Sequence, residues 1–213
     1  MTPISVDAWD ATMISVTPIE AAFVTRLSRK TVEQAIDRHE VSSMGLGGGV
    51  RVLGYADLVY LRGRGELGRW LSAEGKREVY GTLRSAVRSG QEHPTITIGP
   101  MSIDLSAIVG AVRERLEMIR QAEAMVSVDP DVRAGEPVVR GTRVPVHMLA
   151  DLVRQGASRE ELAEDYPAVS EQALEAALLY ARLHPRRGRR PRAPWHAETE
   201  TPRPARGRKP RAA

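Results

Sequence analysis

The chain has 213 residues, of which 42% are hydrophobic and 27% charged, a balance typical of a soluble protein with one large or two small domains. It contains no cysteine, which excludes disulfides, thiolate metal sites and a cysteine nucleophile. Its apolar runs are shorter than the roughly 18 to 20 residues of a membrane helix, and acidic Asp7 stands where a secretory signal would be basic, so we expect a cytoplasmic location.

The positive charge is concentrated at the C-terminal end of the chain. The formal net charge is +4, but residues 185–213 alone contain ten basic and two acidic residues, so the rest of the chain is net acidic. This tail is also rich in proline and cannot build a core, so we expect it to be disordered when the protein is alone. Composition and motifs divide the chain into an N-terminal arm (1–16), a winged helix-turn-helix DNA-binding domain (17–69), a central helical and dimerisation segment (70–125), a hairpin and three-helix domain (126–184) and the basic tail (185–213).

The first structural signal in chain order is a helix start. Thr17 and Glu20 have the spacing of a capping box, and Pro18 fits the first helical position. Ser28 can cap a second helix, which we expect to span residues 29–40. Its inward face follows helical spacing and consists of Val32, Ala35 and Ile36. Two short helices joined by a tight turn predict a helix-turn-helix.

A glycine-rich stretch comes next and predicts a wing. Gly45 and residues 47–49, all glycine, break the chain, and residues 50–53 follow as a short strand. A third helix opens at Tyr55. In this layout, residues 17–67 are similar to the winged DNA-binding domains of the mercury-resistance-regulator class.

The outer face of the second helix and the predicted wing supply the candidate DNA contacts. Long basic and amide side chains at the start of a recognition helix are suited to phosphates and base edges, although Glu33 and Asp37 interrupt this face. On charge alone, a solvated surface helix fits equally well, and the order of cap, helix, turn, helix, glycine loop and strand favours DNA. The predicted DNA-binding residues are Ser28, Arg29, Lys30, Gln34, Arg38 and Arg51.

The central segment predicts structure rather than chemistry. Residues 72–89 have helical spacing, residues 95–105 alternate as two short strands around a Gly-Pro turn, and residues 106–125 form a long amphipathic helix. Such a helix is typical of a core or dimer-forming element, and we expect this one to be a linker that also dimerises. We expect a homodimer, because regulators of palindromic operators need two-fold symmetry.

Residues 126–184 predict a hairpin followed by three helices. Val138–Val139 and Val144–Val146 are β-prone, and Gly141 between them can take the positive φ of a tight turn. The helices are expected at 147–155, 158–165 and 170–184, again with helix-turn-helix topology. The exposed face here is acidic and would be repelled by phosphates, so we assign it to a protein partner or to plain solvation. Its acidic residues are Glu160, Glu164, Asp165, Glu171 and Glu175.

The same region carries a family resemblance. The pattern begins at Asp129-Pro130, continues with Arg140-Gly141-Thr142-Arg143-Val144-Pro145-Val146, and ends with Gly156, Ser158, Asp165-Tyr166-Pro167 and Ala177-Leu178-Leu179-Tyr180. It resembles small bacterial domains, formerly of unknown function, that are typically antitoxins paired with PIN-domain toxins, and the whole chain is similar to mycobacterial VapB antitoxins. The resemblance implies a type II antitoxin that binds and neutralises a PIN-domain ribonuclease and binds operator DNA to regulate its own synthesis.

The resemblance also implies a use for the arginines. PIN ribonucleases are thought to hold a metal with clustered carboxylates, and guanidinium groups match carboxylates bidentately. The predicted toxin-binding residues are Arg140, Arg143, Arg186, Arg187, Arg189, Arg190, Arg192 and Trp195. The alternative from another class is a stand-alone transcription regulator whose C-terminal domain dimerises or senses a ligand.

No pattern in the sequence indicates an enzyme. The glycine run is not followed by a phosphate-binding lysine, and no Ser-His-acid or paired-carboxylate arrangement stands out. The histidines lack ligand spacing, so we expect neither a metal site nor a cofactor; they are His39, His93, His147, His184 and His196. The predicted fold is mainly α with short β-hairpins, an N-terminal winged helix-turn-helix joined to a C-terminal hairpin and three-helix domain.

Overall fold

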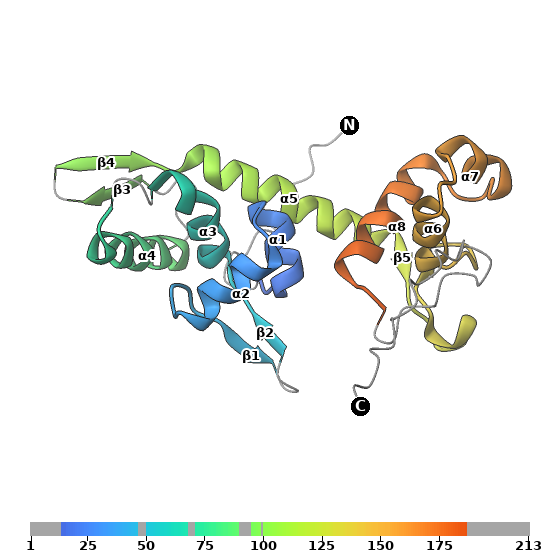
Figure 1. Ribbon diagram of the computed structural model, residues 1–213, viewed down its shortest axis with the longest axis horizontal. Helices are drawn as coiled ribbons and strands as arrows, with labels where there is room; N and C mark the ends of the chain where they lie inside the picture. Colours follow the sequence, from blue (N-terminus) through green and yellow to red (C-terminus); the bar gives the residue numbers. More distant parts are fainter. Residues whose placement is uncertain (1–13, 47–49, 68–70, 90–94, 99, 187–213) are drawn as a thin grey trace, which may run out of the picture.

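A long helix, α5 (Ser106–Ala124), connects the two ends of the molecule in the computed structural model (Figure 1). The structure describes residues 14–46, 50–67, 71–89, 95–98 and 100–186. We call the described part of residues 14–105 the N-terminal unit and residues 126–186 the C-terminal unit. The predicted arm, most of which precedes residue 14, lies largely outside the described residues.

The predicted helix-turn-helix is present. Helix α1 (Pro18–Thr25) begins with both halves of the Thr17–Glu20 capping box and ends at Arg26, which has a left-handed backbone. Helix α2 (Arg29–Asp37) is capped by Ser28, as predicted. The helix is three residues shorter than expected because His39 takes a positive φ of 55°, which turns the chain away from the helix axis.

The wing is a hairpin of β1 (Met44–Leu46) and β2 (Val50–Val52), with Met44 opposite Val52. The break expected at Gly45 lies inside this hairpin, where Gly45 pairs with Arg51, and the other glycines of the stretch, 47–49, lie outside the described residues. The expected strand 50–53 is confirmed, and Leu53 extends the pairing through an antiparallel bridge to Val16.

The rest of the N-terminal unit packs behind the helix-turn-helix. Helix α3 (Tyr55–Leu67) lies against α4 (Ala73–Arg88), and the hairpin of β3 (Thr95–Ile98) and β4 (Met101–Asp104) follows, as the sequence predicted. One hydrophobic core joins all these elements, so residues 71–105 share a core with the helix-turn-helix. Its largest fully buried side chains include Leu53, Leu58, Leu61 and Leu83.

Helix α5 uses its apolar face inside its own chain. The buried side chains of this face are Val109, Val112, Leu116, Ile119 and Ala122. They pack against α3 and α1 at one end and against α8 (Glu171–Leu183) at the other. The apolar face of α5 is therefore part of the core of its own chain. Its expected role in homodimerisation stays a prediction.

The C-terminal unit contains the predicted hairpin and adds one strand to it. Residues 144–146 pair with the first strand through a bridge from Pro145 to Val138 and a hydrogen bond from Val139 N to the Val144 carbonyl at 2.9 Å. The added strand, β5 (Val126–Ser127), directly follows α5 and forms a ladder with β6 (Val138–Val139). Gly141 has the predicted positive φ, 77°, in a turn where the Val139 carbonyl accepts a hydrogen bond from Thr142 N at 3.0 Å.

Three helices complete this unit: α6 (Val146–Arg154), α7 (Arg159–Asp165) and α8. A short 3₁₀ turn, η1 (Arg133–Gly135), precedes β6. These elements form the second hydrophobic core of the molecule, which includes Val139, Leu149, Leu162 and Leu174. The fold class is therefore confirmed as mainly α with short hairpins, and none of the helices described has the length and apolarity needed to cross a membrane.

Candidate nucleic-acid interface and partner surface

Helix α2 presents a polar, mainly basic face to solvent. Its apolar side chains Val32, Ala35 and Ile36 are buried, which turns the remaining faces of the helix outward. Ser28 Oγ accepts a hydrogen bond from Thr31 N at 3.1 Å and fixes the start of the helix. The structure therefore brings five of the six predicted DNA-binding residues onto one exposed helix and its cap: Ser28, Arg29, Lys30, Gln34 and Arg38.

The acidic residues on this face pair with its arginines. Arg29 Nε lies 2.7 Å from Glu33 Oε1, and Arg51 Nη1 lies 2.6 Å from Asp37 Oδ1. Both pairs are exposed, and such pairs contribute about 0–1 kcal/mol to stability, so a phosphate can replace the carboxylate at small cost. Lys30 forms no ion pair with any described residue.

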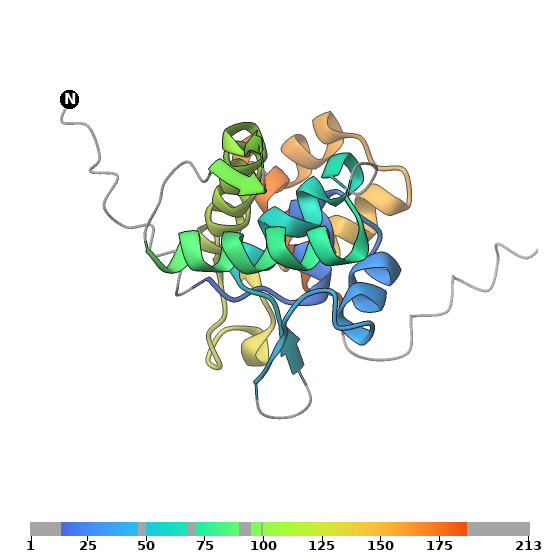
Figure 2. The ribbon, with the colours of Figure 1, turned by 90° about the vertical axis from the view of Figure 1, so that its left-hand side faces the viewer.

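The second of these pairs connects the wing to α2. Arg51 lies on β2, and Asp37 is the last residue of α2. Figure 2 shows the β1–β2 hairpin projecting from the body of the N-terminal unit. The sixth predicted contact, Arg51, is thus exposed beside the end of α2, where a wing can reach the backbone of a bound duplex.

A buried polar network supports both ends of the wing, and sequence reasoning missed it. The Asp57 carboxylate accepts hydrogen bonds from Tyr80 Oη and, at 2.7 Å, from Gly54 N. Tyr80 Oη in turn accepts from Ser42 N at 2.7 Å. Because Ser42 precedes β1 and Gly54 follows β2, the network ties the wing to α3 and α4. The Gly54-to-Asp57 spacing, an acid three residues after a helix cap, was the available signal.

Burial raises the pKa of Asp57 above its ordinary value of 3.8. The hydrogen bonds from Tyr80 and Gly54 and the positive charge of Arg84 oppose this shift. Burial also raises the pKa of the Tyr80 hydroxyl. At neutral pH Tyr80 is therefore the donor of the hydrogen bond to Asp57.

In the C-terminal unit, Arg140 has an internal role. Its Nε donates to the Ala124 carbonyl, and its Nη2 donates to the Val126 carbonyl at 3.2 Å. Its backbone N donates to the Met125 carbonyl at 2.8 Å. Arg140 therefore satisfies the carbonyls at the end of α5 and connects that helix to the hairpin turn. A toxin contact for this residue stays a prediction, and so does one for Arg143, which is exposed in the same turn.

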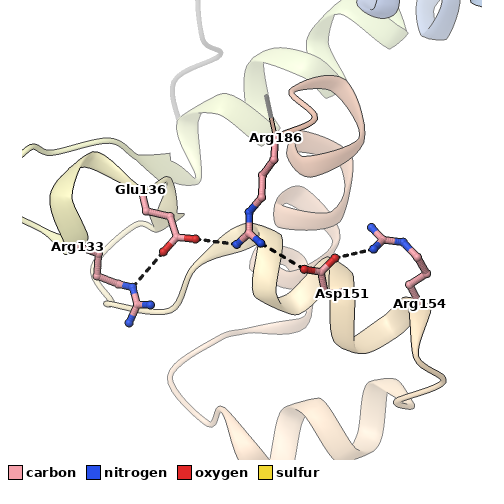
Figure 3. A network of polar contacts seen from close by, with 5 residues as sticks. All are labelled: Arg133, Glu136, Asp151, Arg154 and Arg186. Atoms are coloured by element: carbon pink, nitrogen blue, oxygen red, sulfur yellow. Dashed lines mark hydrogen bonds and ion pairs between the residues drawn. The ribbon is translucent and has the colours of Figure 1, made fainter. Parts of the chain in front are cut away.

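The first arginine of the predicted tail belongs to an ion-pair network on the C-terminal unit (Figure 3). Arg186 lies 2.7 Å from Glu136 and 3.4 Å from Asp151. Glu136 also pairs with Arg133 and Asp151 with Arg154. The remaining predicted toxin-binding residues lie outside the described residues: Arg187, Arg189, Arg190, Arg192 and Trp195.

Two further features of this unit bear on partners. The expected acidic face is exposed, and Arg159 pairs with two of its residues, Glu175 at 2.8 Å and Glu171 at 3.8 Å. A cleft of about 420 Å³ opens between α5 and α8. It is lined partly by apolar side chains such as Met118 and Leu179, with Arg182 among its polar groups.

The class defined by this geometry is a winged helix-turn-helix unit joined through one long helix to a hairpin and three-helix unit. Residues 126–181 match the family model described as "Protein of unknown function (DUF433)". The chain is 34% identical over 182 residues to uncharacterized protein y4eO of Sinorhizobium fredii (strain NBRC 101917 / NGR234), covering 80% of this chain and 82% of that protein. It belongs to the same family as y4eO.

A solved structure was also found. The crystal structure of Rv2018 from Mycobacterium tuberculosis matches 76% of this chain and 95% of its own, with 19% identity and a TM-score of 0.32. A score this low does not define a shared fold.

Proposed function

We propose that this protein is a DNA-binding antitoxin that regulates its own operator through the N-terminal unit and neutralises a PIN-domain ribonuclease through the C-terminal unit and tail. The observation that supports it best is the exposed basic start of α2 beside a wing whose Arg51 pairs with Asp37. A recognition helix and a wing held in fixed register are what a groove and its flanking phosphates require.

In this proposal α2 enters the major groove with its N-terminus leading. Arg29 and Lys30 lie in its first turn, where they can reach phosphates or base edges, and Gln34 lies one turn further along. Arg51 contacts the adjacent backbone from the wing. The Asp57–Tyr80 network ties both ends of the wing to α3 and α4, which fixes the wing on the N-terminal unit.

The neutralising role is supported by the motif resemblance of residues 126–184 and by the arginines of this region. A folded unit that docks first raises the local concentration of the attached basic tail at the toxin. We assign positioning to the hairpin, with exposed Arg143, and blocking of a carboxylate site to the tail arginines.

The alternative is a stand-alone regulator that senses a small molecule. The cleft between α5 and α8 favours it, because about 420 Å³ is within the usual range for ligand pockets and α5 is the helix that links the two units. The discriminating observation is whether the neighbouring open reading frame encodes a PIN-domain protein that co-purifies with this chain.

The DNA half of the proposal predicts a large effect for Arg29→Ala combined with Lys30→Ala. We expect operator affinity to fall about 10- to 100-fold, and the slope of log affinity against log salt to fall by about one unit for each lost phosphate contact. Fluorescence anisotropy with the promoter fragment upstream of the gene measures both quantities.

The matched control removes the same charges from α4, with Lys76→Ala and Arg77→Ala together. This variant has the same net charge as the first, so nonspecific attraction falls equally in both. Operator binding by the α2 variant that equals binding by the α4 variant would contradict the assignment of α2 as the recognition helix.

A further inference from the structure

Three ionisable side chains that are far apart in the sequence meet where the two units join. Glu20 is in the first turn of α1, Glu123 in the last turn of α5, and His184 directly follows α8. Their ligand atoms all lie within 4.8 Å of one another. His184 Nε2 is 3.7 Å from Glu20 Oε1 and 3.8 Å from Glu123 Oε1.

The Glu20 carboxylate is fixed in place by the capping box. Its Oε2 accepts hydrogen bonds from Thr17 N at 2.6 Å and from Thr17 Oγ1 at 3.0 Å. This leaves Oε1 facing His184, and only 9% of the Glu20 side chain is exposed. An oriented carboxylate whose other oxygen is already hydrogen-bonded is a preorganised metal ligand.

The imidazole of His184 is also held in place. Its ring packs against Tyr180 at an interplanar angle of 41°, with the ring centroids 4.4 Å apart. Nε2 is buried and has no hydrogen-bond partner among the described residues, because both carboxylates are beyond hydrogen-bonding distance. A buried nitrogen without a partner is unfavourable, so an ion that bridges it to the two carboxylates would remove that penalty.

The local electrostatics favour a cation. Neither Glu20 nor Glu123 forms an ion pair with a lysine or arginine among the residues described. The C-terminal ends of α5 and α8 both lie here, and each adds partial negative charge.

We propose that Glu20, Glu123 and His184 bind one divalent transition-metal ion, with Zn²⁺ as the best match. One imidazole and two carboxylates are a donor set suited to Zn²⁺ rather than to Mg²⁺, which prefers oxygen ligands in an octahedron. Donors about 2.1 Å from a tetrahedral ion are roughly 3.4 Å apart. The two distances from His184, 3.7 and 3.8 Å, therefore need shifts of a few tenths of an ångström. The two carboxylate oxygens lie within 4.8 Å of each other and close to the same spacing when both coordinate the ion.

Such an ion would fasten the helix-turn-helix to the C-terminal unit. Its ligands come from α1, from α5 and from the end of α8, so one ion would hold three elements together. The wide separation of positions 20, 123 and 184 explains why the spacing of histidines along the chain gave no signal. This inference does not depend on which partner the C-terminal unit binds.

The test is calorimetric titration of ZnCl₂ into full-length protein freed of metal with EDTA, combined with thermal unfolding. We expect one tight site per chain, and a rise in the melting temperature of about 5–10 °C when free Zn²⁺ exceeds its Kd a hundredfold. MgCl₂ at the same concentration should produce no shift. Co²⁺ in place of Zn²⁺ should give the visible absorption of a low-coordinate ion.

The decisive variants are Glu123→Gln and His184→Gln. Each should lose the tight Zn²⁺ site and the visible absorption of bound Co²⁺. The matched controls are Glu117→Gln, on the same helix, and His147→Gln, on α6, and both should keep them. The far-ultraviolet circular dichroism of each metal-free variant shows whether it is folded. Stoichiometric binding that survives in both decisive variants, or an absence of tight binding in the unaltered protein, would overturn the proposal.

Discussion

The α2 face of the N-terminal unit and the hairpin of the C-terminal unit both expose arginines, but they hold them differently. On α2 and the wing, Arg29 and Arg51 pair with exposed carboxylates of the same surface. On the hairpin, the Arg140 guanidinium donates to backbone carbonyls at the end of α5. An arginine paired to a solvated carboxylate is easily released to a ligand, whereas one that satisfies backbone carbonyls is part of the fold.

This comparison predicts its largest effect on stability at Arg140. Arg140→Ala leaves the carbonyls of Ala124 and Val126 without these donors, so we expect a loss of about 1–2 kcal/mol in the free energy of unfolding. Arg143→Ala, three residues along, should change stability by less than about 0.5 kcal/mol. Urea unfolding of both variants measures the difference, and equal losses would show that the hairpin does not distinguish the two arginines.

The sequence predicted most helix positions because helix caps are local. Thr17 with Glu20, Ser28 and Ser158 all cap as expected, and most helix ends fall within one residue of the prediction. The end of the second helix was the exception. It depends on the left-handed backbone of His39, and nothing in the sequence around His39 distinguishes it from a residue inside a helix.

The errors and omissions concern contacts between distant residues. The pairing of Val126 with Val139 depends on where α5 ends in space, which neither strand encodes alone. The internal role of Arg140 has the same origin, because its acceptors lie 14 and 16 residues earlier. Of the candidate sites, the α2 face could be predicted from its helical period. In the wing supports, only the contact between Gly54 and Asp57 has a local signal, because Tyr80 is distant in sequence from both of its partners.

In the N-terminal unit we expect a smaller effect, a change in the free energy of unfolding with pH that comes from Asp57. Because burial raises the pKa of Asp57, the folded protein keeps a proton that the unfolded chain has released just above pH 3.8. The stability contributed by this group is therefore present below pH 3.8 and is lost as the pH rises through the folded pKa.

Asp57→Asn removes that titration and keeps the side-chain shape. The stability of the unaltered protein relative to Asp57→Asn should fall as the pH rises from 4 towards neutrality, since other carboxylates titrate equally in both proteins. Chemical unfolding at a series of pH values measures it. A difference that rises with pH would mean that the hydrogen bonds from Tyr80 and Gly54 outweigh burial.

The smallest effect is expected for the exposed pair of the wing. Arg51→Ala should change stability by less than about 0.5 kcal/mol, and should lower operator affinity about three- to tenfold with a salt slope reduced by about one unit. Asp37→Ala releases Arg51 from its partner and should leave affinity unchanged or raised. Equal losses of affinity in both variants would indicate that the pair fixes the wing and that Arg51 does not contact DNA.

The central claim is that operator recognition and toxin neutralisation belong to different parts of the chain. Its most direct test is RNA cleavage by the PIN-domain ribonuclease that the proposal requires, measured with full-length protein, with a fragment ending at Arg186, and with the Arg29→Ala and Lys30→Ala variant. The fragment keeps the Arg186 ion pairs, so its folded unit is preserved. The account predicts full inhibition by the double variant and a fragment that still binds the ribonuclease but inhibits it poorly. Full inhibition by the fragment, or loss of inhibition in the double variant, would contradict it.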